Sequence, residues 1–370
     1  MSLDTLRRVA LIWLGLVCAW SGTARAQAVA DSLATEEKKN YLVPIPVIYY
    51  TPETKLALGA SFAWIYRSNP EDVESRPSTL GGIGIYTLRN QVILGLGLDH
   101  YFDSDRQQIT AGLAYRKFPN DFYGIGNATP VDDPEEFTDE GAGVNLDYLR
   151  TLRGPWRAGF GLMFGTSSIT GVEPGDMLDG DAIPGSGGGQ VLGASLLAHY
   201  DSRDQVGYPT TGGFGQLALR QHGEVLGADY AFGQTTLDLR RYFSLGATRV
   251  IAIRGLGIAS GGEVPFQLLP QLGGDQLLRG YFGGRFRERQ LVAAQAEYRS
   301  RVWKRVGVAA FGAVGQVAHD LDGLGMGRFR SSFGLGLRFL LIAQEGMNLR
   351  MDFGFGEDQS AFYLSFGEAF

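Results

Sequence analysis

Gln234–Arg240 reads QTTLDLR, and polar and apolar side chains alternate along it. Its even-numbered positions are polar, and its odd-numbered positions are apolar from Leu237 onward. Because successive side chains of a β-strand point to opposite faces, this period of two predicts a strand with one polar and one apolar face. The segment therefore indicates β-structure in which each strand separates two different environments.

The same alternation recurs in runs of about ten residues that are separated by turns. Ala294–Arg299 alternates in this way, and Phe362, Leu364, Phe366 and Phe370 share one face of the final run. A soluble β-sandwich also alternates, but its buried face is the apolar one and it rarely needs so many long strands. Small or polar residues on the other face are typical of a transmembrane β-barrel, which is apolar toward lipid and polar toward its lumen.

Sixteen such runs can be counted. They cover about 43–50, 55–67, 78–88, 90–102, 106–117, 139–152, 155–170, 189–201, 211–223, 227–243, 247–260, 287–302, 304–318, 327–341, 345–355 and 361–370. The longest connections, 118–138, 171–188 and 261–286, all follow odd-numbered runs. With a periplasmic N-terminus these long connections are extracellular, as in bacterial barrels. We therefore predict an all-β fold, a 16-stranded antiparallel transmembrane β-barrel.

Composition excludes other classes of protein. The 370 residues have a mean hydropathy of −0.05 and include 54 glycines. Membrane-spanning helices need runs of about 20 apolar residues, and glycine disfavours helix interiors. Aromatic residues make up 12% of the chain, which argues against disorder. These features favour a large, glycine-punctuated β protein.

The N-terminus has the features of a secretory signal peptide. Arg7 and Arg8 precede the apolar run 9–20, and Ala24–Ala26 provides an A-x-A cleavage site. We expect a signal peptide over 1–26, a short periplasmic segment over 27–42 and the barrel over 43–370. Residues 27–42 are too few for a folded domain, which needs at least about 50 residues. Cleavage removes Cys18, so neither disulfides nor thiol chemistry are expected in the mature chain.

The predicted mature chain is acidic. The formal net charge is −6, and cleavage removes a net charge of +2, which leaves −8. A net negative charge offers no general attraction to nucleic acid or to anionic lipid. We expect no nucleic-acid partner.

A motif in the longest late connection suggests a family. Leu269–Tyr281 reads LPQLGGDQLLRGY, and it is followed by RFRE at Arg285–Glu288 and QAEYR at Gln295–Arg299. With YDSRD at Tyr200–Asp204 and DFYGIGN at Asp121–Asn127, this order resembles the BamA/TamA family of outer-membrane assembly and translocation barrels, also called bacterial surface antigens. The resemblance covers the mature chain nearly end to end.

The resemblance implies that the sixth extracellular loop folds inward and carries Arg279, Gly280 and Tyr281 into the lumen. A buried Arg279 needs a counter-charge, and Glu297 on the polar face of the next strand is the best candidate. From spacing alone, Arg279 is more simply a solvated loop arginine. The family tends to have F-x-D-x-G on strand 13, but Phe311–Gly315 reads FGAVG. We therefore expect a weaker lock between loop and wall.

The two ends of the barrel carry further candidate residues. The first strand contains Pro44 and Pro46, and each proline removes a donor from the hydrogen-bond ladder. This predicts weak closure of the seam between the first and last strands. Phe366 and Phe370 end the last strand, and they resemble the C-terminal signal that the outer-membrane assembly machinery reads. Both are expected to face lipid.

The resemblance implies a function in the outer membrane of a Gram-negative bacterium. The barrel is expected to aid insertion, translocation or secretion of a polypeptide or lipid-like client. Expected partners are outer-membrane lipid, the assembly machinery during biogenesis and the client, with a monomeric barrel. We expect no counterpart of the family's soluble repeat domains in this sequence, because residues 27–42 are too few to form one.

Two alternatives remain, a passive diffusion channel for small solutes and a lipid or peptide hydrolase. The hydrolase is disfavoured because His100, His199, His222 and His319 are scattered singly. We predict no catalytic, cofactor or metal site, and no enzymatic activity.

Overall fold

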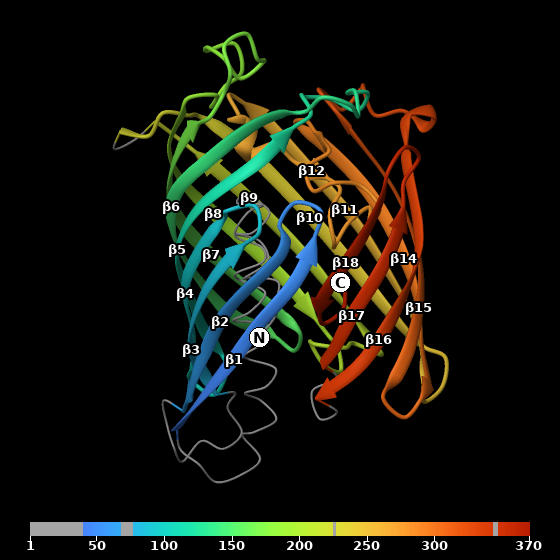
Figure 1. Cartoon of the computed structure of the whole chain (residues 1–370). Helices are drawn as coiled ribbons and strands as arrows, with labels where there is room; N and C mark the ends of the chain where they lie inside the picture. Colours follow the sequence, from blue (N-terminus) through green and yellow to red (C-terminus); the bar gives the residue numbers. More distant parts are fainter. Residues whose placement is uncertain (1–39, 68–76, 225–226, 343–346) are drawn as a thin grey trace.

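The computed structural model describes residues 40–67, 77–224, 227–342 and 347–370. The predicted signal peptide lies outside the described residues. Sixteen antiparallel strands close into one barrel (Figure 1), which confirms the predicted fold class. In the described part of the chain, no helix is long and apolar enough to cross a membrane.

The barrel strands follow one another around the wall in chain order. They are β1 (Asn40–Thr51), β2 (Lys55–Tyr66), β3 (Ser78–Thr87), β4 (Val92–Phe102), β5 (Gln107–Phe122), β6 (Glu135–Arg153), β7 (Trp156–Thr170), β8 (Gly188–Asp201), β9 (Gly212–His222), β10 (Phe232–Ser244), β11 (Arg249–Gly262), β14 (Gln290–Trp303), β15 (Val306–Ala318), β16 (Arg330–Ile342), β17 (Met347–Phe355) and β18 (Ser360–Phe366). Two short strands, β12 (Gln271–Leu272) and β13 (Phe286–Arg287), lie in the connection between β11 and β14 and pair with each other as a separate sheet. Two short 3-10 helices, η2 (Phe266–Leu268) and η3 (Met326–Arg328), lie in connections.

Each predicted run coincides with one barrel strand. The largest differences are at loop ends, because β5 and β6 continue pairing from Phe118↔Asp139 as far as Phe122↔Glu135. β10 begins at Phe232 rather than at residue 227. Local alternation therefore locates the strands. The exact residue at which a strand ends depends on how far it continues to pair with the neighbouring strand, which local alternation does not report.

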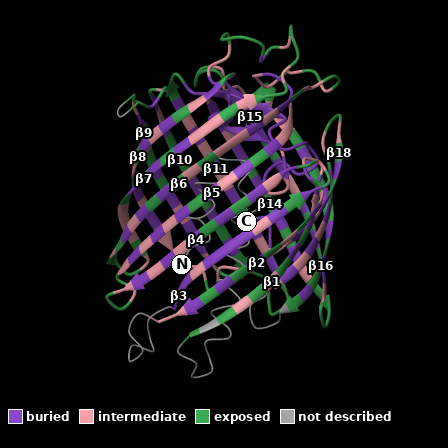
Figure 2. Cartoon of the chain, turned by 60° about the vertical axis from the view of Figure 1, so that its left-hand side comes forward, coloured by how far each residue is buried: buried purple, intermediate pink, exposed green. Residues whose placement is uncertain are grey.

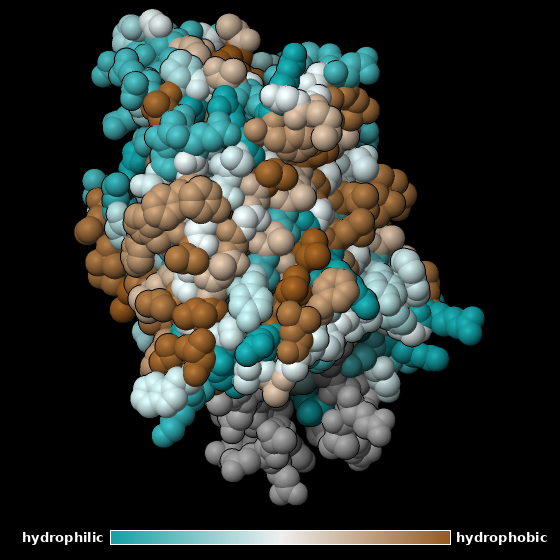
Figure 3. All heavy atoms as spheres, turned by 90° about the vertical axis from the view of Figure 1, so that its right-hand side faces the viewer, coloured by the Kyte–Doolittle hydropathy of each residue, from teal (hydrophilic) through white to brown (hydrophobic). Residues whose placement is uncertain are grey.

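The two faces of the wall differ as the alternation predicts (Figure 2). In β10, Leu237 and Leu239 are 44% and 51% exposed, whereas Asp238 and Arg240 are 3% and 5% exposed. Apolar side chains also gather over the middle of the outer surface, with hydrophilic ones above them (Figure 3). The outer face thus suits hydrocarbon, and the inner face is enclosed.

Strand length varies around the wall. β5 and β6 have 16 and 19 residues, whereas β17 and β18 have only 9 and 7. β1 pairs with β2 along all of its 12 residues. Its register with β18 consists of the single pair Tyr50↔Leu364 between the two fully described strands. The shortest barrel strand, β18, and the fewest register pairs therefore occur at the β1–β18 seam.

The inner face is not uniformly small or polar. A hydrophobic cluster lines β1 to β8, with Ile83, Ile93 and Phe122 among its buried members. Phe266 and Leu268 from the connection between β11 and β14 pack into the same cluster. The expected small-residue lumen is wrong here, because an incoming segment supplies apolar side chains and this part of the interior packs as a protein core.

The last four residues leave the wall. β18 ends at Phe366, and Gly367 adopts a φ of 72°. Phe370 is 3% exposed and packs against Tyr242 and Ala252 on the inner face of β10 and β11. The prediction that the final strand reaches residue 370 with Phe370 facing lipid is therefore wrong. The glycine lets the chain turn into the lumen, where the aromatic ring finds an apolar pocket.

Candidate functional site

The connection between β11 and β14, residues 263–289, is called the lumenal loop below. From residue 264 to residue 288 every residue is buried or half-buried. Gly126 N donates to Arg287 O at 2.9 Å, and the Arg287 guanidinium lies 5.1 Å from the ring centre of Phe122. Burial lowers the pKa of Arg287 to about 10. The loop is thus enclosed by the barrel and is held by contacts with an outer connection as well as with the wall.

Arg279 lies at the centre of this loop. It is 1% exposed, and its two terminal nitrogens contact the carboxylates of Glu297 on β14 and Asp352 on β17. Its guanidinium also lies 3.5 Å from the ring centre of Phe311. One arginine therefore joins two strands of the wall and stacks on a side chain of a third, β15.

The two carboxylates belong to a larger buried network. Arg338 on β16 donates to Asp352 at 2.5 Å and to Glu297 at 3.2 Å. Arg338 Nε also reaches Glu368 in the curled C-terminal segment at 2.8 Å. Arg299 Nε donates to Glu297 at 2.8 Å. Charges that are buried together in this way stabilise one another only when each is paired, so the network fixes loop, wall and C-terminus in one arrangement.

The C-terminal segment has its own contacts. Arg299 Nη2 donates to the carbonyl oxygen of Phe370 at 2.9 Å. Asn348 Nδ2 on β17 donates to Glu368 Oε1 at 2.8 Å. The tail is therefore bound to the wall by polar groups as well as by the Phe370 ring.

A second arginine ties the loop to the last hairpin. Arg350 on β17 donates to the carboxylate of Asp275 at 2.7 Å and to its carbonyl oxygen at 3.0 Å. Arg350 Nε also donates to Ser365 Oγ on β18 at 3.0 Å. Arg350 thus joins the loop to β17 and, through Ser365, to the other strand of the hairpin that forms one side of the seam.

Gly280 and Tyr281 fit closely against the β17–β18 turn. Gly280 has a φ of 123°, and a Cβ there would lie 2.7 Å from Gly356 N. Gly280 N donates to Tyr363 Oη at 3.1 Å, and Tyr281 Oη accepts a bond from Glu357 N at 2.8 Å. A side chain at position 280 would be both strained and obstructed.

The other side of the seam also touches the loop. Glu53, in the turn between β1 and β2, accepts a hydrogen bond from Gly283 N. Burial raises the pKa of Glu53 above its ordinary value. Gln359, in the β17–β18 turn, accepts a bond from Phe282 N at 3.2 Å. Adjacent loop residues therefore bridge the turns on both sides of the seam.

Pro44 and Pro46 lie in β1 opposite Phe62 and Ala60 of β2. Alternate residues of a strand direct their backbone groups to the same neighbour. Because the β1–β2 register runs through both prolines without a shift, their missing donors belong on the side toward β18. Tyr50 has the same parity and forms the one β18 pair. The β1 edge that faces β18 therefore lacks two backbone donors, at Pro44 and Pro46, and both precede the one register pair at Tyr50.

The structure brings Arg279 and Glu297 together and adds residues that the sequence reading missed. Ala313 provides no carboxylate, and Asp352 on β17 supplies one to Arg279 instead. Asp352 occupies an inward position of the alternating run Arg350–Gly354. An inventory of inward-facing charged residues could have suggested Asp352 and Arg338, although not their contact with the loop.

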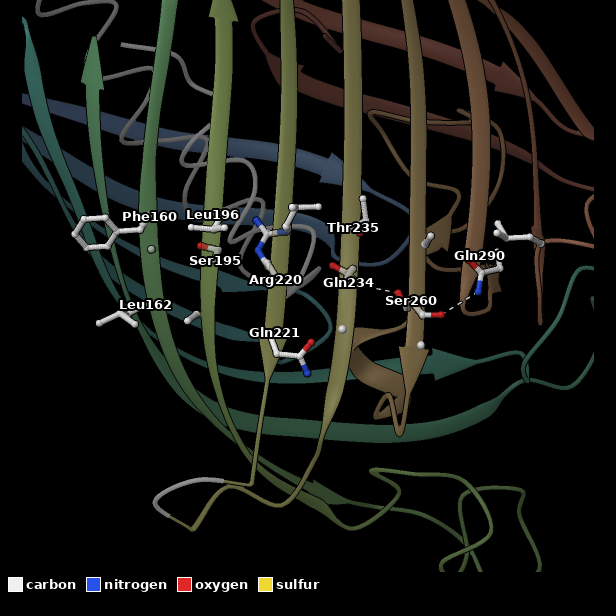
Figure 4. A pocket seen from close by; sticks show the side chains of 17 residues that line it. Phe160, Leu162, Ser195, Leu196, Arg220, Gln221, Gln234, Thr235, Ser260 and Gln290 are labelled. Carbon is white, nitrogen blue, oxygen red and sulfur yellow. Dashed lines mark hydrogen bonds between the residues drawn. The ribbon is translucent and has the colours of Figure 1, made fainter. Parts of the chain in front are cut away.

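A pocket of about 710 Å³ lies along β7 to β11 (Figure 4). Its polar residues include Ser195, Arg220 and a chain in which Gln234 and Gln290 both donate to Ser260, at 3.2 and 2.9 Å. Among its described lining residues there is no histidine and no carboxylate. The pocket therefore offers a hydroxyl without a base, which is not the pairing that nucleophilic catalysis needs. Within the described ranges, no three potential metal ligands cluster either.

Known proteins share this architecture. The family model described as the Omp85 superfamily domain matches residues 91–370. The crystal structure of BamA from Haemophilus ducreyi lacking POTRA domains 1-3 is similar with a TM-score of 0.63 at 15% identity, over 89% of this chain and 70% of that one. CdiB from Acinetobacter baumannii and CdiB from Escherichia coli give TM-scores of 0.57 and 0.56 at 12% and 9% identity. Each comparison covers 89% of this chain, and 60% and 63% of the respective CdiB chains.

Among curated proteins no match to the chain was found. The structural likenesses, all at low identity, show the shared barrel, and the family model matches about three quarters of the sequence. The chain belongs to the Omp85 superfamily.

Proposed function

We propose that this barrel aids insertion, translocation or secretion of a polypeptide client in the outer membrane of a Gram-negative bacterium, and that the client engages the β1–β18 seam. The observation that carries the proposal is the single register pair between β1 and β18. An edge strand with unpaired backbone groups can accept an added strand by hydrogen bonding. Membership of the same superfamily as BamA-like barrels supports the class of activity. The proposed client is a polypeptide.

The height of the wall supports the seam as the site. Seven residues of β18 span roughly 23 Å along the strand, or about 16 Å across a membrane at a 45° tilt. The apolar band of outer-membrane barrels is about 25 Å tall. A bilayer beside β18 would have to thin locally, and thinning lowers the barrier for a polypeptide that enters the membrane there.

A steady diffusion channel is the less favoured function. The lumenal loop is enclosed by the barrel, and part of the lumen around it packs as a hydrophobic core. A pore for small solutes needs a water-filled path. A hydrolase has no nucleophile and base in the pocket described above, so neither alternative has an observation in its favour.

The roles of the site residues belong to the same proposal. Arg279, Gly280 and Tyr281 would hold the lumenal loop against the seam hairpin through Glu297 and the β17–β18 turn. Pro44 and Pro46 would keep the β1 edge open to a client. Phe366 and Phe370 would serve as the signal read by the assembly machinery during biogenesis.

A disulfide across the seam tests the mechanism. Tyr50→Cys with Leu364→Cys places two outward-facing thiols on directly opposed residues, and Cys18 is the one native cysteine. The matched control is Leu219→Cys with Thr235→Cys, an outward-facing opposed pair within the β9–β10 ladder. The readout is insertion of a test barrel polypeptide into proteoliposomes that contain the purified protein.

We expect the oxidised seam variant to lose most of its activity and to recover it on reduction. The oxidised control variant should keep its activity. Equal activity of the oxidised and reduced seam variant would exclude opening of the seam as the mechanism.

A further inference from the structure

Charge is distributed unevenly between the two rims of the barrel. The long connections 123–134, 171–187 and 223–231 contain eight acidic residues and neither lysine nor arginine. At the opposite rim, the β10–β11 and β14–β15 turns are basic, and residues 240–249 and 299–305 contain no aspartate or glutamate. The acidic net charge of the chain therefore conceals a local basic surface.

The two basic turns lie side by side. Arg301 N donates to Thr248 O at 2.8 Å, and Arg249 is paired with Ser300 in the β11–β14 ladder. Together they present five exposed cations, and we call this surface the basic turn patch. Its members are Arg241, Arg249, Arg301, Lys304 and Arg305.

Aromatic side chains indicate the depth of the basic turn patch relative to the membrane. Trp303 is 67% exposed with Lys304 Nζ 5.9 Å from its ring centre, and Phe243 is 44% exposed with the Arg241 guanidinium 5.6 Å away. Trp64 and Trp156, the other described tryptophans, also lie within two residues of strand ends at this rim. Tryptophan prefers the interface between headgroups and hydrocarbon. The cations therefore lie at headgroup level.

We infer that the basic turn patch binds anionic phospholipid headgroups of the leaflet that surrounds this rim. The inference rests on the membrane location in the proposed function. The segments 240–249 and 299–305 that carry these exposed cations contain no aspartate or glutamate. Exposed cations attract phosphate, and each contributes about fivefold in affinity at an anionic surface. An acidic protein partner is disfavoured, because Trp303 and Phe243 accompany the cations and suit the hydrocarbon boundary.

The test measures the lipid that remains bound to the protein. Purified full-length protein is reconstituted in vesicles of phosphatidylglycerol and phosphatidylcholine in equal amounts, and it is then extracted with mild detergent. The bound lipids are counted by mass spectrometry. We expect phosphatidylglycerol to be enriched about fivefold or more over phosphatidylcholine, and 1 M salt during extraction to reduce the enrichment strongly.

The test variant is Arg301→Gln, Lys304→Gln and Arg305→Gln. The matched control removes three cations elsewhere, with Arg106→Gln, Lys117→Gln and Arg328→Gln. Arg241 and Arg249 remain in the test variant, so its enrichment should fall severalfold rather than vanish, whereas the enrichment of the control should persist. Equal enrichment in both variants would overturn the inference, as would absence of enrichment in the unmodified protein.

Two further results separate the possible causes. If polyglutamate binds the unmodified protein at low salt and phosphatidylglycerol is not enriched, an acidic protein partner replaces the lipid and the inference is wrong. If the protein is removed from vesicles by alkaline carbonate, the membrane location itself is wrong. Retention in the bilayer without enrichment contradicts only the lipid inference.

Discussion

Arg279 illustrates how a single side chain is stabilised inside this barrel. It is 1% exposed, and both Glu297 and Asp352 contact it. Burial of an arginine without counter-charges is expensive, so the two carboxylates and the guanidinium depend on one another. The network also includes Arg338, which contacts both carboxylates. Loss of one member therefore leaves the others with unbalanced charge.

Arg279→Ala should lower the free energy of unfolding by about 3–5 kcal/mol, because it leaves two buried carboxylates with fewer partners. Folding yield should fall as well. Heat-modifiable gel mobility and urea unfolding in detergent measure both effects. Arg328→Ala, at an exposed loop position, is the control and should change stability by less than about 0.5 kcal/mol. If Arg279→Ala were as stable as the unmodified protein, the lumenal contacts of Arg279 would contribute nothing to the free energy of unfolding.

Glu53→Gln should make stability less dependent on pH. Because burial raises the pKa of Glu53, the folded protein holds this proton more tightly than the unfolded chain does. This contribution is complete below the ordinary value of 4.5 and is lost as pH rises through the folded-state pKa. Glutamine keeps an oxygen for Gly283 N and has no charge to bury.

Urea unfolding between about pH 4 and pH 8 checks this expectation. The variant should be the more stable protein at neutral pH, and the difference should shrink toward the acidic end. The exposed Glu136→Gln substitution is the matched control. A difference that stays constant across the pH range would contradict the assignment.

Among the strands, β1 and β18 differ from the rest of the wall. β9 and β10 pair over eleven residue pairs, whereas β1 and β18 share one. Cooperative units with few backbone hydrogen bonds open locally at low free energy. Loop contacts on both sides, through Glu53 and Gln359, oppose that opening. The seam therefore combines few β1–β18 register pairs with loop contacts that hold its two sides together.

Hydrogen exchange should distinguish the seam from the wall. Peptides that cover 40–51 are expected to exchange at least about tenfold faster than peptides that cover 214–222, because the described residues of β1 share one register pair with β18. Mass spectrometry of the protein in detergent or nanodiscs measures the rates. Faster exchange confined to 40–51 and 360–366 is the expected pattern, and equal protection around the barrel would contradict a weak seam.

The barrel as a whole is a closed wall with a partly filled interior. The lumenal loop and the curled C-terminus occupy it from different sides, and the charge network joins them through Arg338. Loop, wall and C-terminus thus form one packed unit.

In planar bilayers the unmodified protein should show low or intermittent conductance. The buried loop and the hydrophobic cluster fill this part of the lumen with packed side chains. Replacement of the loop tip, 273–283, by a short glycine–serine linker should increase conductance severalfold if the variant assembles. A large and steady conductance in the unmodified protein would instead favour the diffusion channel.

Local patterns predicted the fold well because each strand carries its own alternation, as in Gln234–Arg240. The Arg279–Glu297 contact could be predicted from the sequence because the next strand has a carboxylate on its inner face. The Arg279–Asp352 contact could not be predicted, because Asp352 lies 73 residues from Arg279 and no local pattern reports such a contact. Phe370 was misplaced for a similar reason, because alternation continues past Gly367 in the sequence while the backbone turns away.

The inward C-terminus has a practical consequence for labelling. The carbonyl oxygen of Phe370 accepts a bond from Arg299, and its ring is buried against β10 and β11. An affinity tag or fluorescent protein fused to this end would begin inside the barrel and would have to pull the tail out to reach solvent. Reporters are better inserted at 179–182 of the β7–β8 connection, where all four residues are exposed.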